Sequence, residues 1–135
     1  MENPSSSSIE KGATINLNSN YEWVKHGFSS LEANVTSQSS TSSRVGYQYA
    51  DDSIGGKTFK ATVDVKTDDS TWKLQMLYYT NAWSSPSSVT ITNGESSPFI
   101  QLEIPSAATK IWIRLNTSGE TGSSILSDNW CLEEV

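Results

Sequence analysis

The sequence predicts an all-β protein built as an antiparallel β-sandwich. Two observations favour this class. Short runs rich in Thr, Val, Ile, Trp and Tyr alternate with turn residues at short, regular intervals, and no stretch shows a helical period of useful length. Within the clearest runs polar and apolar side chains alternate, which indicates one solvated face per strand and antiparallel pairing. The chain has 135 residues, the length of a single domain.

We expect residues 1–12 to be a linker or disordered tail, and residues 13–135 to form the sandwich. Residues 5–8 are four consecutive serines, and this stretch offers few apolar side chains for a core. The first residues carry neither the basic nor the apolar segment of a signal peptide. We interpret them as the end of a linker that joins the domain to the rest of a larger protein.

About nine strands are expected in the sandwich, each a β-type run that ends at turn residues. Polar residues 37–43 and the Gly-rich loop 51–57 separate the early runs, Asn93-Gly94 marks a tight turn, and Pro105 ends a run. The candidate runs, ten in all, from which about nine strands are expected, are 13–17, 21–24, 31–36, 44–49, 58–66, 72–79, 89–92, 99–104, 109–116 and 125–135.

Strict alternation is clearest in the middle of the chain. In the run 58–66 the four apolar residues share one face, and in the run 109–116 three apolar residues do. The inward residues of these two runs are Phe59, Ala61, Val63, Val65, Ile111, Ile113 and Leu115. In the run 72–79 we expect Trp72, Leu74, Met76 and Tyr78 on the core face. The four residues 67–70 suit a hairpin turn between the runs 58–66 and 72–79.

Charge and composition exclude several classes of partner. The net charge is −6, which speaks against nucleic acid, anionic membranes and polyanions as the main partner. No apolar run is long enough for a membrane helix. The single cysteine, Cys131, excludes an internal disulfide, and we expect its thiol to be buried.

No motif of known catalytic chemistry is present. The chain lacks a phosphate-binding loop, a zinc-binding HExxH pattern and a serine nucleophile elbow. His26 is the only histidine and lies in a stretch that reads as a turn. Asp64 and Glu103 point outward from their runs and leave a carboxylate pair for sugar hydrolysis open as an alternative. We expect a protein without enzymatic activity.

Aromatic rings stand where the core does not need them. Trp112 and Tyr79 share faces with polar residues, and Trp83 lies in a polar loop. A sugar ring has an apolar C–H face, on which Trp and Tyr stack, and a belt of hydroxyls that planar polar side chains bind. The alternative is that these rings support the sheet through cross-strand pairs. The candidate ligand-binding residues are Trp112, Trp83, Tyr79, Arg114, Gln75, Asn116, Tyr47 and Tyr49.

Three segments carry a family resemblance. The stretch 56–66 (GKTFKATVDVK) resembles a strand of jelly-roll carbohydrate-binding modules in the galactose-binding-domain-like superfamily. The stretch 104–115 resembles that family's I-P-x-x-A-T-x-I-x-I-R segment, and the stretch 125–134 resembles its closing strand. The resemblance covers residues 13–135.

The resemblance implies a jelly roll that binds polysaccharide or oligosaccharide without catalysis, as an extracellular accessory module of a carbohydrate-active enzyme or adhesin. It also implies a structural Ca²⁺ held by Asp128, although the matching opening stretch Asn16–Glu22 lacks the family's Gly and Phe. One alternative is a structural jelly roll of a phage tail, fibre or adhesin, whose exposed aromatic rings contact protein. Another is a small jelly-roll enzyme that acts on polysaccharide.

Overall fold

The computed structural model describes residues 6–10, 13–18, 30–35, 43–69, 71–117 and 124–135. These residues form eleven β-strands and no α-helix. No helix in this part of the chain has the length and apolarity needed to cross a membrane. The strands are β1 (Ser6–Glu10), β2 (Ala13–Asn18), β3 (Ser30–Val35), β4 (Ser43–Ala50), β5 (Thr58–Thr67), β6 (Lys73–Tyr79), β7 (Ser87–Thr90), β8 (Gly94–Ser96), β9 (Phe99–Glu103), β10 (Lys110–Thr117) and β11 (Ser124–Glu134).

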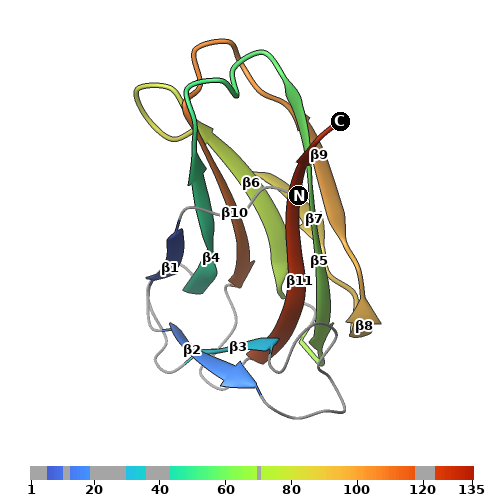
Figure 1. Ribbon diagram of the computed structural model, residues 1–135. Helices are drawn as coiled ribbons and strands as arrows, with labels where there is room; N and C mark the ends of the chain where they lie inside the picture. Colours follow the sequence, from blue (N-terminus) through green and yellow to red (C-terminus); the bar gives the residue numbers. More distant parts are fainter. Residues whose placement is uncertain (1–5, 11–12, 19–29, 36–42, 70, 118–123) are drawn as a thin grey trace.

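The strands form two antiparallel sheets that face each other (Figure 1). The first sheet has the order β1-β4-β10-β6-β7. The second has the order β2-β3-β11-β5-β8, and β9 also pairs with β5. The predicted all-β antiparallel sandwich is therefore confirmed. We refer to these as the first and second sheets.

The core lies between the sheets and follows the predicted alternation. Every second residue of β5, from Phe59 to Thr67, is buried. Ile111, Ile113 and Leu115 of β10 face them from the first sheet, with Trp72, Leu74 and Met76 from the region of β6. Trp72 has no exposed surface at all, as expected for the largest side chain of a close-packed interior.

The connection after β5 is not the predicted hairpin turn. β5 belongs to the second sheet and β6 to the first, so the chain crosses between the layers after Thr67 and before Lys73. The apolar faces of β5 and β6 therefore look at each other across the core, whereas in a hairpin they would share one side of a sheet. Asp69 holds this crossing through bonds from the backbone N–H of Thr71 at 2.9 Å and that of Trp72 at 3.5 Å. Connection length alone does not distinguish the two arrangements.

Two strands lie where the sequence predicted none. β1 falls within the stretch expected to be a tail, and β8 lies at the expected turn. β1 pairs with the edge of β4, from Ser6 opposite Gln48 to Glu10 opposite Arg44. Strand pairing uses backbone groups alone, so a serine-rich edge strand leaves no hydrophobic signature. The run 21–24 lies outside the described residues, and the boundary at residue 12 stays a prediction.

The closing strand β11 contains a bulge that changes which side chains face inward. Its register with β5 shifts between Asp128 and Cys131, and Asn129 takes a left-handed φ of 52°. Trp130 and Leu132 consequently point into the core. Cys131 lies opposite the outward Thr62 and is only partly buried, so the prediction of a buried thiol was wrong.

Candidate functional site

The outer face of the first sheet carries most of the predicted binding residues in cross-strand rows. Residues directly opposite each other in paired strands share a face. Trp112 stands between Gln48 of β4 and Leu77 of β6, and Lys110 stands beside Tyr79. The next row toward the other end of the strands joins Gly46, Arg114, Gln75 and Ser88. Arg44, Asn116, Lys73 and Thr90 form the last row.

Three aromatic rings form a chain at one end of this face. The ring centroids of Tyr79 and Trp83 lie 5.3 Å apart with planes at 65°, and those of Trp83 and Trp112 lie 5.5 Å apart at 58°. Such edge and tilted contacts suit the charge distribution of aromatic rings. We call Tyr79, Trp83 and Trp112 the ring chain. It brings together a loop residue and two strand residues, each of which the sequence predicted as a binding residue on separate grounds.

The loop after β6 is folded back so that Trp83 reaches the sheet. Trp83 forms an isolated bridge with Tyr79. The backbone N–H of Ser84 donates to the carbonyl of Tyr78 at 2.9 Å, while the Ser84 hydroxyl accepts from the N–H of Tyr78 at 3.1 Å. These two bonds tie the residue that follows Trp83 to β6 and so hold the indole beside the sheet.

Two cations lie over the rings. The Arg114 guanidinium carbon is 4.4 Å from the Trp112 ring centroid, and the Lys110 ammonium nitrogen is 4.7 Å from that of Tyr79. Both distances fall within the range of cation–π attraction. The positive charges therefore belong to the same surface as the rings.

A hydrogen-bonded network continues from Arg114 across the strands. Its Nε donates to Gln75 Oε1 at 2.7 Å, and Gln75 Nε2 donates to Ser88 Oγ at 3.2 Å. Arg114 and Gln75 are 6% and 7% exposed. The network holds the guanidinium over the Trp112 ring.

The side of the sheet was predicted correctly for Trp112, Arg114 and Gln75, but their exposure was not. Trp112 is only 5% exposed, although it lies outside the core cluster. The Trp112 side chain lies against Trp83 and Arg114, and its partner in the strand register is the buried Leu77. Among the described residues the Trp112 Nε1 has no hydrogen-bond partner. Alternation gives the side of a sheet on which a residue lies, not how deeply its neighbours cover it.

The remaining binding candidates divide between the two sides of the first sheet. Asn116 is half-buried on the outer face, as predicted. Tyr47 and Tyr49 pack against the core on the inner face, so the structure does not bring them to the ring chain. Tyr47 contacts Trp130 edge to face at 5.1 Å. Burial, and then the nearby charge of Asp128, raises the pKa of the Tyr47 phenol.

The described residues do not supply enough further ligands beside Asp128 to form the predicted calcium site. An oxygen of Asp128 accepts from the backbone N–H of Asn129 at 2.7 Å, and Asp64 lies opposite Asp128 in the strand register. In the part of the chain that the structure describes, no three acidic, histidine or cysteine side chains gather as metal ligands. Glu22 of the opening stretch and His26 lie outside it.

Asp64 and Glu103, the two carboxylates that the sequence left open as a catalytic pair, do not lie together near the rings. Glu103 lies opposite Thr58, six residues along β5 from Asp64, which separates the two by roughly 20 Å at the rise of a strand. Glycoside hydrolysis needs its two carboxyl groups within roughly 5–10 Å. Asp64 and Asp128 are neighbours, but on the outer face of the second sheet.

Comparison with known proteins gives likenesses of structure alone. No protein-family model matches the chain, and no curated protein does. The enzymatically active domain of bacteriophage CBA120 tailspike protein 4 aligns with a TM-score of 0.69 at 17% identity, over 96% of this chain and 19% of that one.

Several isolated modules align over most of both chains. A family 16 carbohydrate-binding module has a TM-score of 0.67 at 12% identity and is covered over 87% of its length by 91% of this chain. A family 61 module solved with β-1,4-galactotriose has a TM-score of 0.64 at 14% identity, over 96% of this chain and 88% of its own. The chain therefore has the β-sandwich fold found in carbohydrate-binding modules.

Proposed function

We propose that this chain is a non-catalytic carbohydrate-binding module that uses the outer face of the first sheet. It would serve as an accessory module in a larger extracellular protein, either a carbohydrate-active enzyme or an adhesin. The observation that carries the proposal is the ring chain, which lies beside planar polar side chains on a solvent-facing sheet surface. The fold shared with carbohydrate-binding modules supports it.

The three rings differ in exposure, and we infer that they have different roles in binding. Trp83 and Tyr79 are half-buried and therefore keep ring surface on which a sugar can stack. Trp112 lies against Trp83 and Arg114 and supports the Trp83 indole. Asn116, which is half-buried, supplies donors and an acceptor for sugar hydroxyls further along the face.

Hydrogen bonds hold the site in place, and we infer that it is preorganised for a ligand. Trp83 is fixed by the loop bonds of Ser84, and Arg114 by Gln75. A ligand then loses its own freedom but does not have to order the protein, which keeps the entropic cost of binding low. Weak contacts of this kind suit repeated binding along a polysaccharide.

Affinity electrophoresis on soluble polysaccharides, preceded by a glycan array, tests the proposal. We expect retardation of the wild type and its loss in Trp83→Ala. The matched control is Phe99→Ala, because Phe99 is a 55% exposed aromatic residue in the second sheet. Retention of binding in Trp83→Ala with loss in Phe99→Ala would move the site to the other sheet. No binding to any glycan would refute the function.

A structural role is the second candidate, because part of a bacteriophage tailspike protein shares the fold. In that case the ring chain would be covered by another protein chain. Sedimentation analysis separates the two functions, since a ring chain that joins copies of this protein gives an oligomer that Trp83→Ala returns to monomers.

We also propose, as the family resemblance implies, that Asp128 contributes to a structural Ca²⁺ site. Thermal unfolding with Ca²⁺ and with a chelator tests it. A melting temperature raised by Ca²⁺ in the wild type but not in Asp128→Asn is expected, and equal values with and without Ca²⁺ would refute the site.

A further inference from the structure

The two outer faces of the sandwich carry opposite charge, despite the overall net charge of −6. On the first sheet, the outward positions of β4, β10, β6 and β7 hold four of the nine Lys and Arg residues of the chain and no Asp or Glu. The four cations are Arg44, Lys73, Lys110 and Arg114. The edge strand β1 adds Glu10, opposite Arg44.

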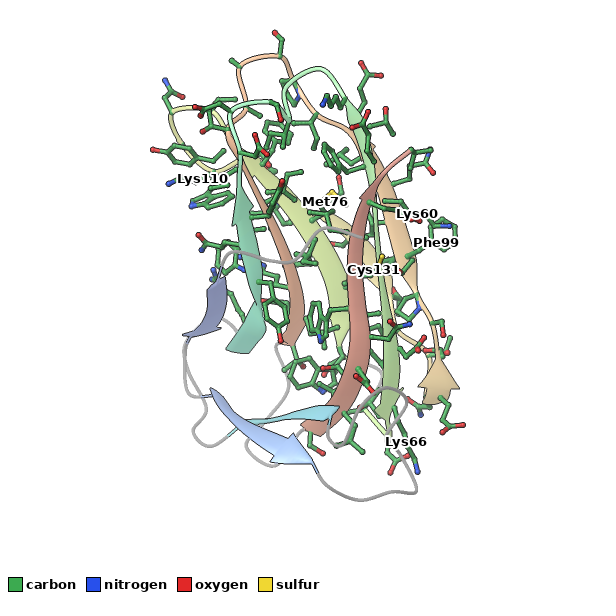
Figure 2. All side chains as sticks on the ribbon, in the orientation of Figure 1. Lys60, Lys66, Met76, Phe99, Lys110 and Cys131 are labelled. Atoms are coloured by element: carbon green, nitrogen blue, oxygen red, sulfur yellow. The ribbon has the colours of Figure 1, made fainter. Side chains whose placement is uncertain are left out.

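The second sheet shows the reverse pattern. The outward positions of its paired strands β5, β8, β9 and β11 hold more acids than lysines. The acids are Asp64, Glu95, Glu103, Asp128 and Glu133, against Lys60 and Lys66. In Figure 2, Lys110 lies on the side of β4 and β10, whereas Lys60 and Lys66 lie on the opposite side of the molecule. The charges are therefore separated by face, which the linear sequence does not reveal.

The cations run along the whole length of the candidate binding face. Lys110 lies over Tyr79 at the ring end, Arg114 lies over Trp112 in the middle, and Lys73 lies in the last row beside Asn116. The seven residues from Lys110 to Asn116 are six steps along the strand and span roughly 20 Å. A chain of several sugars that stacks on the rings would therefore pass positive groups at both ends of the face.

We propose that the ligand is an anionic polysaccharide, one whose sugars carry carboxylate or sulfate groups. This inference rests on the proposed function and names its ligand class. A neutral sugar can accept hydrogen bonds from the ammonium groups of Lys110 and Lys73, whereas an anionic sugar gains in addition a charge contact with each. The acidic opposite face repels the same polymer, so charge also selects the face on which it binds.

A nucleic acid is the competing polyanion. A phosphate chain meets the same cations, and the net charge of −6, which speaks against polyanions in general, opposes it and an anionic polysaccharide alike. Charge alone therefore does not separate the two ligands. The rings favour a ligand with flat apolar C–H faces. Single-stranded DNA therefore enters the test as a competitor whose binding would contradict the inference.

Two pairs of lysines allow a matched experiment. Lys110 and Lys60 each place an ammonium 4.7 Å from an aromatic ring centroid, over Tyr79 and Phe99 respectively, on opposite faces. Lys73 and Lys66 are exposed lysines on the same two faces. The double variant Lys110→Gln/Lys73→Gln and its control Lys60→Gln/Lys66→Gln change the net charge equally, which removes any effect of overall charge.

Affinity electrophoresis and calorimetry measure binding of the full chain to three sets of polymers. The carboxylated set is polygalacturonate and alginate, the sulfated set is sulfated galactans, and the neutral set is glucans, xylans and galactans. We expect an anionic set to bind most tightly, and its affinity to fall as salt rises from 0.05 to 0.5 M. Lys110→Gln/Lys73→Gln weakens this binding about tenfold, at about threefold for each charge contact. The control double variant leaves it unchanged or strengthens it. Comparison of the carboxylated and sulfated sets identifies the anionic group.

The outcomes separate this inference from the proposed function. Binding to neutral glycans that depends on Trp83 and not on salt or lysines overturns the anionic ligand but keeps the carbohydrate-binding function. Loss of all glycan binding overturns both. Equal weakening by the two double variants, or tighter binding to single-stranded DNA than to any glycan, also refutes the inference.

Discussion

Replacing Gln75 by leucine tests whether the network beneath the ring chain is an energetic unit. Gln75 Oε1 accepts from Arg114 Nε at 2.7 Å, and both side chains are more than nine-tenths buried. Leucine has similar volume, so the packing around it is kept while the acceptor is lost. The guanidinium N–H is then left without this partner in a place that water barely reaches.

The expected cost follows from these contacts. Losing a hydrogen bond to a charged, buried group destabilises a protein by about 2 kcal/mol. The second bond, from Gln75 Nε2 to Ser88 Oγ, is 3.2 Å long and ends on an exposed serine, so it adds little. With a urea m-value of about 2 kcal/mol/M, the unfolding midpoint of Gln75→Leu should fall by about 1 M.

A double-mutant cycle with Arg114→Met isolates the pair. Arg114 makes other contacts, and the cycle cancels their loss because it occurs with and without Gln75. We expect the double variant to be about 1.5 kcal/mol more stable than the sum of the single variants predicts. Gln101→Leu, an exposed glutamine in β9, is the control and should change stability by less than about 0.5 kcal/mol. Strict additivity of the two substitutions would refute the reasoning.

Three further predictions concern stability. Gly46→Ala should destabilise the fold by at least about 2 kcal/mol in urea unfolding, because the new Cβ would collide with the carbonyl oxygen of Ile113 on the paired strand; unchanged stability would contradict the close approach. The pKa of the Tyr47 phenol is raised in the folded protein. Its contribution to the free energy of unfolding is therefore fully present below about pH 10 and is lost as pH rises through the raised pKa. Spectroscopic titration of the wild type should show one tyrosine phenol that ionises at a higher pH than an ordinary tyrosine, and this step should be missing in Tyr47→Phe. Hydrogen bonds from the backbone N–H and the hydroxyl of Ser53 lower the pKa of Asp51. Its contribution to the free energy of unfolding is therefore present above about pH 4 and is lost on acidification. In a plot of melting temperature against pH, the fall at acidic pH should be shallower for Asp51→Asn than for the wild type.

The faces of the strands were predictable from the sequence because alternation is a local property. Phe59, Val63, Ile111 and Leu115 all lie in the core on the side that the period of two assigns to them. The same rule placed Trp112 on the outer face. Whether an outward residue is exposed depends on segments far along the chain, here the loop that carries Trp83.

Sheet membership was not predictable from the same signals. The residues between β5 and β6 contain turn formers in either arrangement, and only the pairing of β5 with β11 and of β6 with β10 shows that the chain crosses the core. The backbone-only pairing of β1 and the inward turn of Tyr47 also depend on strand partners. Long-range pairing, not local propensity, decides these features.

The burial of Trp112 changes what the outer face can do. If the rings stood alone on an exposed sheet, binding a sugar would also have to order the protein's own side chains, at an entropic cost. Here Leu77, Trp112 and Arg114 form a second packed layer on the outer side of the sheet, and Trp83 and Tyr79 contact that layer instead of standing alone. Because the layer includes a fixed guanidinium, rigidity and positive charge come from the same residues. Under the proposed function, a ligand that stacks on Trp83 would meet a preorganised cationic surface, which would favour anionic sugars at little entropic cost.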